Sequence, residues 1–451
     1  MGNIFRGEIG YTYVKIQIKL ATKSMRLSES TAHQPFRNTS DQDLVSVSPA
    51  LLSLLKAERI LLLQGPVGPF FDRLAKWLLG HGKQVDRIVF QGGDQADCRV
   101  LMPRPYRGTP AGWTDFLNQI TRELSTDCIV LFGQSRFYHR TAIELALDVG
   151  IAVVVLEEGY LRPGYITMEL DGVNGYSTTM RRYRWQSTAT HPKIALLRTE
   201  TKPWLFQQMC WFATRHYLAL RLRHKDFPHY QHHKTTSLSY YAAYWLRAWG
   251  KKLWHERFDQ MRIQALAGQP YFFVPLQHDG DAQIIHHSPF SDNTEFILRV
   301  LRSFATYAPK NCKLAFKTHP FSRGGPDHSS LIFAAAKELG IRDRVLHLVE
   351  GHIPSLLRDA SGVVVINSTV GLQALVHGKP LSVEGEALYK IDGLVHRGPL
   401  KTFWTSYKAP DPVRLRDFLE QLRHLTQAPC HVYGRGDEPL HWTTPALRCV
   451  K

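Results

Sequence analysis

Cysteine is scarce in this sequence of 451 residues. No two of its six cysteines have the close spacing of paired metal ligands, and a chain of this length does not need a disulfide framework to fold. The pattern argues against a zinc knuckle and indicates a reducing, cytoplasmic setting. The cysteines are Cys98, Cys128, Cys210, Cys312, Cys430 and Cys449.

Long apolar segments are also missing. No uncharged apolar run approaches the roughly 18 residues that a membrane span needs. Near the N-terminus, the stretch from Tyr11 to Leu20 is interrupted by Lys15, Gln17 and Lys19, so it lacks the apolar core of a signal peptide. We therefore expect any membrane contact to be peripheral.

Acidic residues are outnumbered. Asp and Glu total 39 against 56 for Lys and Arg, which gives a formal net charge of +17. This excess predicts an acidic partner, and the classes it allows are nucleic acid, an anionic membrane surface and a negatively charged substrate. The hydrophobic content of 44% is sufficient for two or three domains with sizeable cores.

Short apolar runs alternate with helical patterns in two parts of the chain. The runs are continuous, as is typical of parallel strands buried on both faces. They predict an α/β protein with two doubly wound, Rossmann-like domains, whose ligands bind beyond the carboxyl ends of the strands. The predicted strands are Ile60–Leu63, Val85–Phe90, Cys128–Phe132, Ile151–Leu156, Phe272–Leu276, Lys313–Lys317, Val345–Leu348, Val363–Ile366 and Leu381–Val383.

Composition divides the chain into five parts. Residues 1–57 are polar and rich in Ser and Thr, and we expect a poorly ordered extension. Residues 58–180 and 269–405 are the two predicted Rossmann-like domains. Residues 181–268 form a predicted helical insertion, and residues 406–451 hold a last helix and a polar tail.

The insertion between the two domains is basic and aromatic. Apolar positions recur at helical spacing in Trp204–Leu222 and Tyr240–Trp254, among many Arg, Lys and His residues. Amphipathic helices of this kind suit an anionic membrane interface or lipid headgroup. Two alternatives stay open, which are helices packed on a domain with solvated basic faces and, more weakly, stacking on single-stranded nucleic acid.

A polar turn follows the predicted strand Val363–Ile366. Asn367, Ser368 and Thr369 are residue types that cap helix N-termini, and a helical pattern follows them. Backbone N–H groups and hydroxyls at such a turn can bind a phosphate. An ordinary capped helix is the alternative.

Polar residues also follow strands of the first domain. The loop Gln64–Phe71 contains Gly65 and Gly68, but it matches neither a dinucleotide fingerprint nor a P-loop, so a ligand loop and a structural turn are equally compatible with it. Arg136 follows the strand Cys128–Phe132 in the same way.

Two carboxylates, Glu157 and Glu158, come directly after the strand Ile151–Leu156. Neighbouring strand residues point to opposite faces, so one of the two is expected to enter a cleft, where it could act as a general base. The alternative is an acid that forms an ion pair, with Arg162 as the nearby partner.

The loop QHDGDAQIIHHSPF, residues 277–290, carries polar groups after a strand of the second domain. Its Asp279-Gly280-Asp281 triplet is a poor match to a metal signature, and the adjacent His286 and His287 lack the spacing of paired metal ligands. His319 follows the strand Lys313–Lys317 and is either structural or, with Lys317, an anion ligand.

Several longer motifs point to one family. They closely resemble the bacterial capsule polysaccharide biosynthesis family of the KpsS/LipB type, over roughly residues 58–425. Residues 1–57 and the triplet at 279–281 depart from that pattern. The motifs are QGPVGPFF (64–71), SRFYHR (135–140), EEGYLRPGYIT (157–167), GVNGYS (172–177), QIIHHSPF (283–290), KTHP (317–320) and INSTVGLQAL (366–375).

The resemblance implies a GT-B-type glycosyltransferase that transfers β-Kdo from CMP-Kdo to lyso-phosphatidylglycerol. The reaction would start the linker of a capsular polysaccharide, at the inner face of the inner membrane and beside other capsule synthesis and export proteins. It implies a single inverting displacement without a metal or other cofactor. Nucleic acid is not an expected partner.

The resemblance also implies roles for particular residues. Glu158 or Glu157 would be the catalytic base, and which of them serves is left open. The residues expected to hold the CMP phosphate are His319, Pro320, Lys317, Asn367, Ser368 and Thr369. Those expected to contact the sugar acid or the acceptor are Gln64, Gly65, Gly68, Arg136, Gln277, His286 and His287.

Two other functions compete with this interpretation. A nucleotide-sugar epimerase of similar architecture would convert a donor without an acceptor. A non-catalytic nucleic-acid or assembly protein would use the basic surface, with a steep salt dependence, and would ignore CMP.

Overall fold

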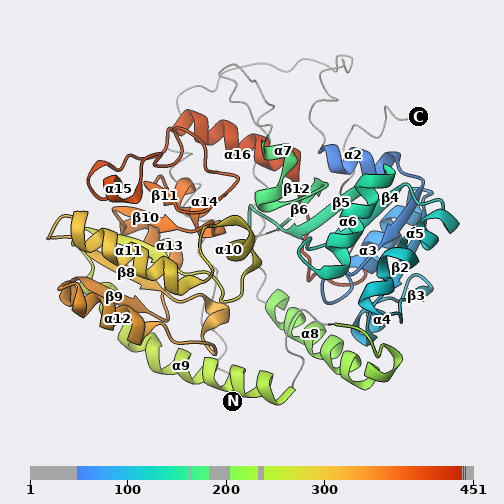
Figure 1. Cartoon of the computed structure of the whole chain (residues 1–451), viewed down its shortest axis with the longest axis horizontal. Helices are drawn as coiled ribbons and strands as arrows, with labels where there is room; N and C mark the ends of the chain where they lie inside the picture. The colour runs from blue at the N-terminus through green and yellow to red at the C-terminus, as the bar shows by residue number, and fades with distance from the viewer. Residues whose placement is uncertain are drawn as a thin grey trace, which may run out of the picture. The chain divides into compact units, whose positions relative to one another are not determined.

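The computed structural model describes residues 48–162, 164–181, 204–231, 238–438, 440 and 442. These residues form two compact units (Figure 1). The N-terminal unit contains the described residues up to 231 together with those from 419 onward. The C-terminal unit contains residues 238–418.

The N-terminal unit is built on a seven-stranded sheet with the order β12-β6-β5-β4-β1-β2-β3. Strands β1 to β5 pair in parallel, which confirms the predicted doubly wound core, whereas β6 pairs antiparallel with both β5 and β12. The sequence analysis did not predict β3, β6 or β12. The strands are β1 Arg59–Leu62, β2 Gln84–Val89, β3 Pro103–Pro105, β4 Cys128–Phe132, β5 Ala152–Glu158, β6 Tyr165–Leu170 and β12 Gln427–Pro429.

Helices cover this sheet and include one in the stretch that we expected to be poorly ordered. Helix α2 buries Ala50, Leu51 and Leu54, so order begins within the predicted extension rather than after residue 57. Residues 1–47 lie outside the described part of the chain. The helices are α2 Pro49–Lys56, α3 Phe70–Gly80, α4 Gly92–Ala96, α5 Trp113–Glu123, α6 Phe137–Val149, α7 Thr178–Arg181 and α8 Trp204–Leu222.

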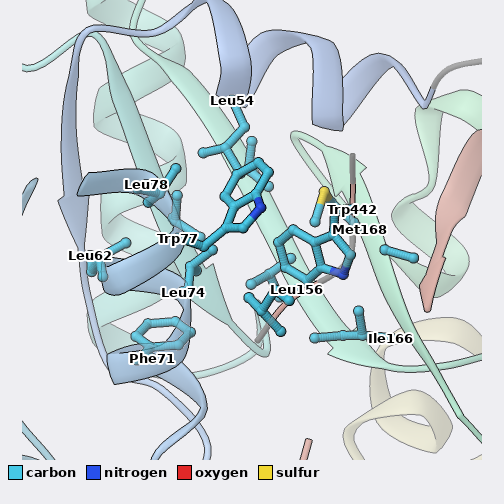
Figure 2. Packing of buried hydrophobic residues seen from close by; sticks show 14 of the residues in the cluster. Leu54, Leu62, Phe71, Leu74, Trp77, Leu78, Leu156, Ile166, Met168 and Trp442 are labelled. Carbon is cyan, nitrogen blue, oxygen red and sulfur yellow. The ribbon is translucent and has the colours of Figure 1, made fainter. Parts of the chain in front are cut away.

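The C-terminal tail completes the core of the N-terminal unit. Trp442 is 3% exposed and meets Trp77 of α3 edge-on, with ring centroids 5.4 Å apart. Its indole nitrogen donates a hydrogen bond to the carbonyl oxygen of Pro429 at 3.0 Å. Figure 2 shows Trp442 beside Trp77, with Leu54 of α2 on the same cluster.

The C-terminal unit holds a five-stranded, fully parallel sheet with the order β11-β10-β7-β8-β9. The prediction of a second parallel domain is thus confirmed, although α10 and α15 were not predicted. The strands are β7 Tyr271–Pro275, β8 Lys313–Lys317, β9 Val345–Leu348, β10 Gly362–Val365 and β11 Leu381–Val383. The helices are α9 Leu238–Ala265, α10 Ala282–His287, α11 Asn293–Tyr307, α12 Ser329–Glu338, α13 Ile353–Asp359, α14 Thr369–Val376, α15 Leu400–Ser406 and α16 Pro412–Thr426.

The predicted helical insertion is not one structural part. Of its helices, α8 belongs to the N-terminal unit and α9 to the C-terminal unit. Helix α16 begins in the C-terminal unit and ends in the N-terminal unit, to which the following strand β12 also belongs. Two Rossmann-like units in one chain form the GT-B-type architecture that the sequence predicts.

The packing of Trp442 leads to a prediction about stability. Because this indole is buried and hydrogen-bonded, Trp442→Ala should lower the free energy of unfolding of the N-terminal unit by about 3–5 kcal/mol. Urea denaturation followed by circular dichroism would measure the loss. Met102→Ala, at a side chain that is 87% exposed, is the control. A loss below about 1 kcal/mol in the Trp442 variant would contradict the assigned packing.

Candidate functional site

Three adjacent parallel strands of the N-terminal unit end at the same edge of its sheet. Strand β4 lies between β1 and β5, so the segments after these strands must emerge side by side. Gln64 and Arg136 lie in the segments after β1 and β4, and Glu157 lies at the end of β5 itself; all three were singled out from the sequence.

Glu157 and Glu158 are the last two residues of strand β5, whereas the sequence analysis placed them directly after the strand. They pair with Thr167 and Ile166 of β6, and because they are neighbours in a strand their side chains leave opposite faces of the sheet. That one of the two enters a cleft stays a prediction.

Glu157 lies against the end of β4. A β-carbon built on Gly133 would stand 3.8 Å from Oε2 of Glu157 and 3.9 Å from Nε of Arg136. The guanidinium of Arg136 also donates a hydrogen bond to the carbonyl oxygen of Gly65 at 3.3 Å. A carboxylate and a guanidinium therefore share the edge formed by β1, β4 and β5.

Glu158 forms the ion pair that the sequence analysis left open. Its Oε2 lies 2.9 Å from Nη1 of Arg162, and the two side chains are 40% and 49% exposed. An ion pair this open contributes little to stability. Tyr433 lies within electrostatic range of both glutamates, and its pKa is raised by burial and further by the charge of Glu158.

The sequence analysis missed a buried carboxylate in this region. Glu169 of β6 is 1% exposed and accepts hydrogen bonds from the hydroxyls of Tyr160, at 2.8 Å, and Ser177. The Tyr160 hydroxyl in turn accepts from the backbone N–H of Asn174 at 2.5 Å. The network joins Tyr160 of the EEGYLRPGYIT motif, through Glu169, to Asn174 and Ser177 of the GVNGYS motif.

Gln64 and Gly68 have structural contacts in the N-terminal unit. The side-chain amide of Gln64 donates to both carboxylate oxygens of Asp94, at 3.1 and 2.9 Å, and to the Tyr230 hydroxyl at 3.0 Å. Gly68 has φ +94°, and a β-carbon there would stand 2.8 Å from the ring of Phe212 in α8. The structure therefore supports the structural-turn alternative for these two residues.

A buried network fixes α8 to the loop after β2. Nδ1 of His216 donates to Asp97 at 2.8 Å, its Nε2 accepts from the Gln91 amide at 2.8 Å, and Arg215 also binds Asp97. Burial raises the pKa of Asp97, but the hydrogen bonds from His216, the Gly68 backbone and Arg215 outweigh it, so the pKa lies below its ordinary value. A β-carbon on Gly93 would stand 2.7 Å from His216, so this glycine permits the close packing.

The edge of the C-terminal sheet brings together the other predicted residues. Strand β7 lies between β10 and β8, so the segments that begin at Gln277, Asn367 and Thr318 are neighbours at the carboxyl edge. Oε1 of Gln277 accepts from the backbone N–H of Asn367 at 3.1 Å. The Asn367 amide donates to the carbonyl oxygens of Gln283, at 2.8 Å, and His287, at 3.2 Å, so it ties α10 to the turn before α14.

Ser368 caps helix α14, as the sequence predicts. Its Oγ accepts from the backbone N–H of Val370 at 3.2 Å, and Thr369 is the first residue of the helix. The Tyr389 hydroxyl donates to the carbonyl oxygen of Ser368 at 2.5 Å and would clash with a β-carbon on Gly371. The turn is therefore held in place, with the positive end of the α14 dipole at the sheet edge.

His319 caps the short 3₁₀ turn Pro320–Ser322. Its Nδ1 accepts from the backbone N–H of Phe321 at 3.1 Å, so the neutral ring carries its proton on Nε2. The ring of His278 lies nearby, with centroids 6.0 Å apart, and its Nδ1 is 2.9 Å from Oγ of Ser322. Two imidazoles are thus gathered at the ends of β7 and β8.

The two aspartates of the Asp279-Gly280-Asp281 triplet bind protein groups. Asp279 accepts from His328 at 2.9 Å and from Asn293 at 2.8 Å. Asp281 caps α10 by accepting from the backbone N–H of Gln283 at 2.9 Å. Their side chains shape this loop.

Lys317, His286 and His287 differ in their surroundings. Lys317 is 3% exposed and donates to the carbonyl oxygens of Thr318, at 3.1 Å, and Val349, at 3.4 Å. Burial lowers the pKa of its ammonium group to about 8. These bonds tie the end of β8 to the segment after β9, and contact of Lys317 with the donor phosphate stays a prediction. His287 is buried in α10, whereas His286 of the same helix is exposed.

Comparison with known proteins identifies the family. The chain matches the model of the capsule polysaccharide biosynthesis protein family over residues 127–433, and it belongs to this family. It is 38% identical to the capsule polysaccharide export protein KpsS of Escherichia coli over 384 residues, which cover 84% of this chain and 97% of KpsS. The resemblance found in the sequence is therefore confirmed.

Other proteins are also similar. The chain is 35% identical over 396 residues to the capsule polysaccharide modification protein LipB of Neisseria meningitidis serogroup B, covering 85% of this chain and 93% of LipB. Among solved structures, a β-Kdo 2,7-transferase, KpsC of Thermosulfurimonas dismutans, has 13% identity and a TM-score of 0.38, covering 81% of this chain and 90% of that chain.

Glu169 leads to a prediction about pH. Burial raises its pKa to about 7 from an ordinary 4.5, although hydrogen bonds from Ser177 and Tyr160 lower it. Between these pH values the unfolded chain loses this proton and the folded chain keeps it. The buried carboxyl group of Glu169 should therefore lower the free energy of unfolding. The loss should grow to about 3 kcal/mol as pH rises from 4.5 to 7 and stay constant above pH 7.

The measurement is urea denaturation of the wild type and of Glu169→Gln at several pH values. The stability of the wild type minus that of the variant should fall across this window and be flat on either side. Glu144→Gln, at an exposed position on α6, is the control for the substitution itself. A flat difference for Glu169 would contradict the burial of an ionisable carboxyl group.

Proposed function

We propose that this protein is a β-Kdo transferase that uses CMP-Kdo as donor and lyso-phosphatidylglycerol as acceptor, and so begins the linker of a capsular polysaccharide. The proposal rests on family membership together with the chemical groups found at two sheet edges. One edge presents a carboxylate beside a guanidinium, and the other presents a helix N-terminus and imidazoles.

The donor half of the proposal rests on the C-terminal unit. The CMP phosphate would bind the N-terminus of α14, where Ser368 and Thr369 supply hydroxyls, and His319 would donate from Nε2 as negative charge develops on the leaving group. These groups can neutralise a departing CMP on their own, so the proposed transfer requires no metal ion or other cofactor. Gln277 and Asn367 hold the turn in position.

The acceptor half rests on the N-terminal unit. A carboxylate would remove the proton of the acceptor hydroxyl as it attacks the anomeric carbon in a single inverting displacement. We assign this role to Glu157, because it lies close to Arg136 at the edge formed by β1, β4 and β5. Arg136 would attract the acceptor phosphate. The reaction is expected at the anionic inner face of the inner membrane, alongside other capsule proteins.

The assignment of the base is tested by substitution. Glu157→Gln keeps the shape of the side chain but cannot accept a proton, so the turnover number should fall about 10²–10⁴-fold while CMP affinity is unchanged. Glu144→Gln, on the exposed surface of the same unit, is the control. Release of CMP and formation of the lipid product would be measured together. Equal activity of Glu157→Gln and the control, with activity lost in Glu158→Gln, would move the role to Glu158.

The donor site is tested by CMP binding. His319→Ala removes a hydrogen bond to a charged phosphate, so the dissociation constant of CMP should rise about tenfold or more by calorimetry. His229→Ala, an exposed histidine of the N-terminal unit, should leave it unchanged. An unchanged CMP affinity in His319→Ala would remove this residue from the donor site. Donor conversion by the protein without any acceptor would instead favour an epimerase.

A further inference from the structure

One face of helix α9 is tightly bound to the C-terminal unit. Ala248 and Asp259, which are three helical turns apart, are buried, and Asp259 accepts hydrogen bonds from the backbone N–H groups of Val349, at 2.8 Å, and Glu350, at 2.9 Å. At the start of the helix, the Tyr244 hydroxyl donates to the carbonyl oxygen of Phe321. In Figure 1, α9 lies at the lower border of this unit. The helix therefore has a fixed orientation.

The opposite face of α9 exposes large apolar side chains. Leu246 and Leu253 are 74% and 66% exposed, and at 100° per residue they project away from Ala248 and Asp259. Trp254 is 70% exposed and Met261 is 63% exposed. A contiguous row of this kind marks an interaction site, because isolated exposed apolar residues are common but an apolar helix face is not.

Positive charge accompanies this row. The sequence of α9 contains five Lys and Arg residues and two acidic residues, of which Asp259 is buried. Arg257 projects from the same face as Leu246 and Leu253, and the exposed Arg247 lies two helical turns before Trp254 on the edge of that face. Aromatic and aliphatic groups flanked by basic side chains suit the boundary between the headgroups and acyl chains of an anionic bilayer.

We propose that the outward face of α9, formed by Leu246, Leu253, Trp254, Arg257 and Met261, inserts into the surface of an anionic membrane. Dimerisation through this face is less favourable, because it would bring the basic side chains of two copies together. Anionic headgroups instead complement these basic side chains. No helix in the described part of the chain is long and apolar enough to cross a membrane. The inference deepens the proposed function by naming the surface that would bring the enzyme to a lipid acceptor.

The test is sedimentation of the full chain with vesicles, in the absence of donor and acceptor, so that its outcome does not depend on transfer. The wild type should bind vesicles that contain phosphatidylglycerol more tightly than vesicles of phosphatidylcholine alone. Replacing Leu246, Leu253, Trp254 and Met261 by Gln should weaken binding to anionic vesicles at least about tenfold. A variant with Arg247→Glu and Arg257→Glu should lose the preference for anionic vesicles.

Met102→Gln, which removes an exposed apolar side chain of the N-terminal unit, is the matched control and should bind as the wild type does. Circular dichroism and thermal melting would establish that each variant is folded. Undiminished vesicle binding by the folded four-residue variant would overturn the proposal. So would a wild type that forms a dimer through this face, as seen by light scattering, and does not bind vesicles. Transfer activity could still be present in either case.

Discussion

The arrangement of the candidate functional groups depends on one constraint. Neighbouring parallel strands all end at the same, carboxyl edge of their sheet, so the segments that follow them emerge at that edge. In the C-terminal unit, β10, β7 and β8 are adjacent, so the polar segments that follow them lie next to one another. The hydrogen bonds of Gln277 and Asn367 then lock two of these segments together. In the N-terminal unit the same constraint places Glu157 beside Arg136.

In the N-terminal unit, buried polar networks orient the helices and strands around the candidate site. Asp97 and His216 fix α8, and glycines at the contact allow the helix to approach closely. Glu169 joins β6 to the turn before it through Tyr160 and to the segment after it through Ser177. Such networks are costly unless every member is satisfied, so they specify one arrangement and exclude near alternatives.

Sequence reasoning succeeded where local patterns decide the structure. The continuous apolar runs Cys128–Phe132 and Lys313–Lys317 became strands with those bounds, and Ser368 became a helix cap. It could not find contacts that join distant residues. For Gly68 it left a ligand loop and a structural turn equally open, because nothing in its own segment shows that Phe212 packs against it. Likewise, the polar tail gave no sign that Trp442 is a core residue, and β6 pairs antiparallel only because the chain turns back directly after Glu158.

The most direct test of the central claim is mass spectrometry of the lipid after the purified protein has been incubated with freshly made CMP-Kdo, fluorescent lyso-phosphatidylglycerol and EDTA. The account predicts that the lipid gains the mass of Kdo in the presence of the chelator. An unchanged lipid, together with no binding of CMP to the protein, would contradict the assignment of the C-terminal edge as a CMP-sugar site and the transferase function with it.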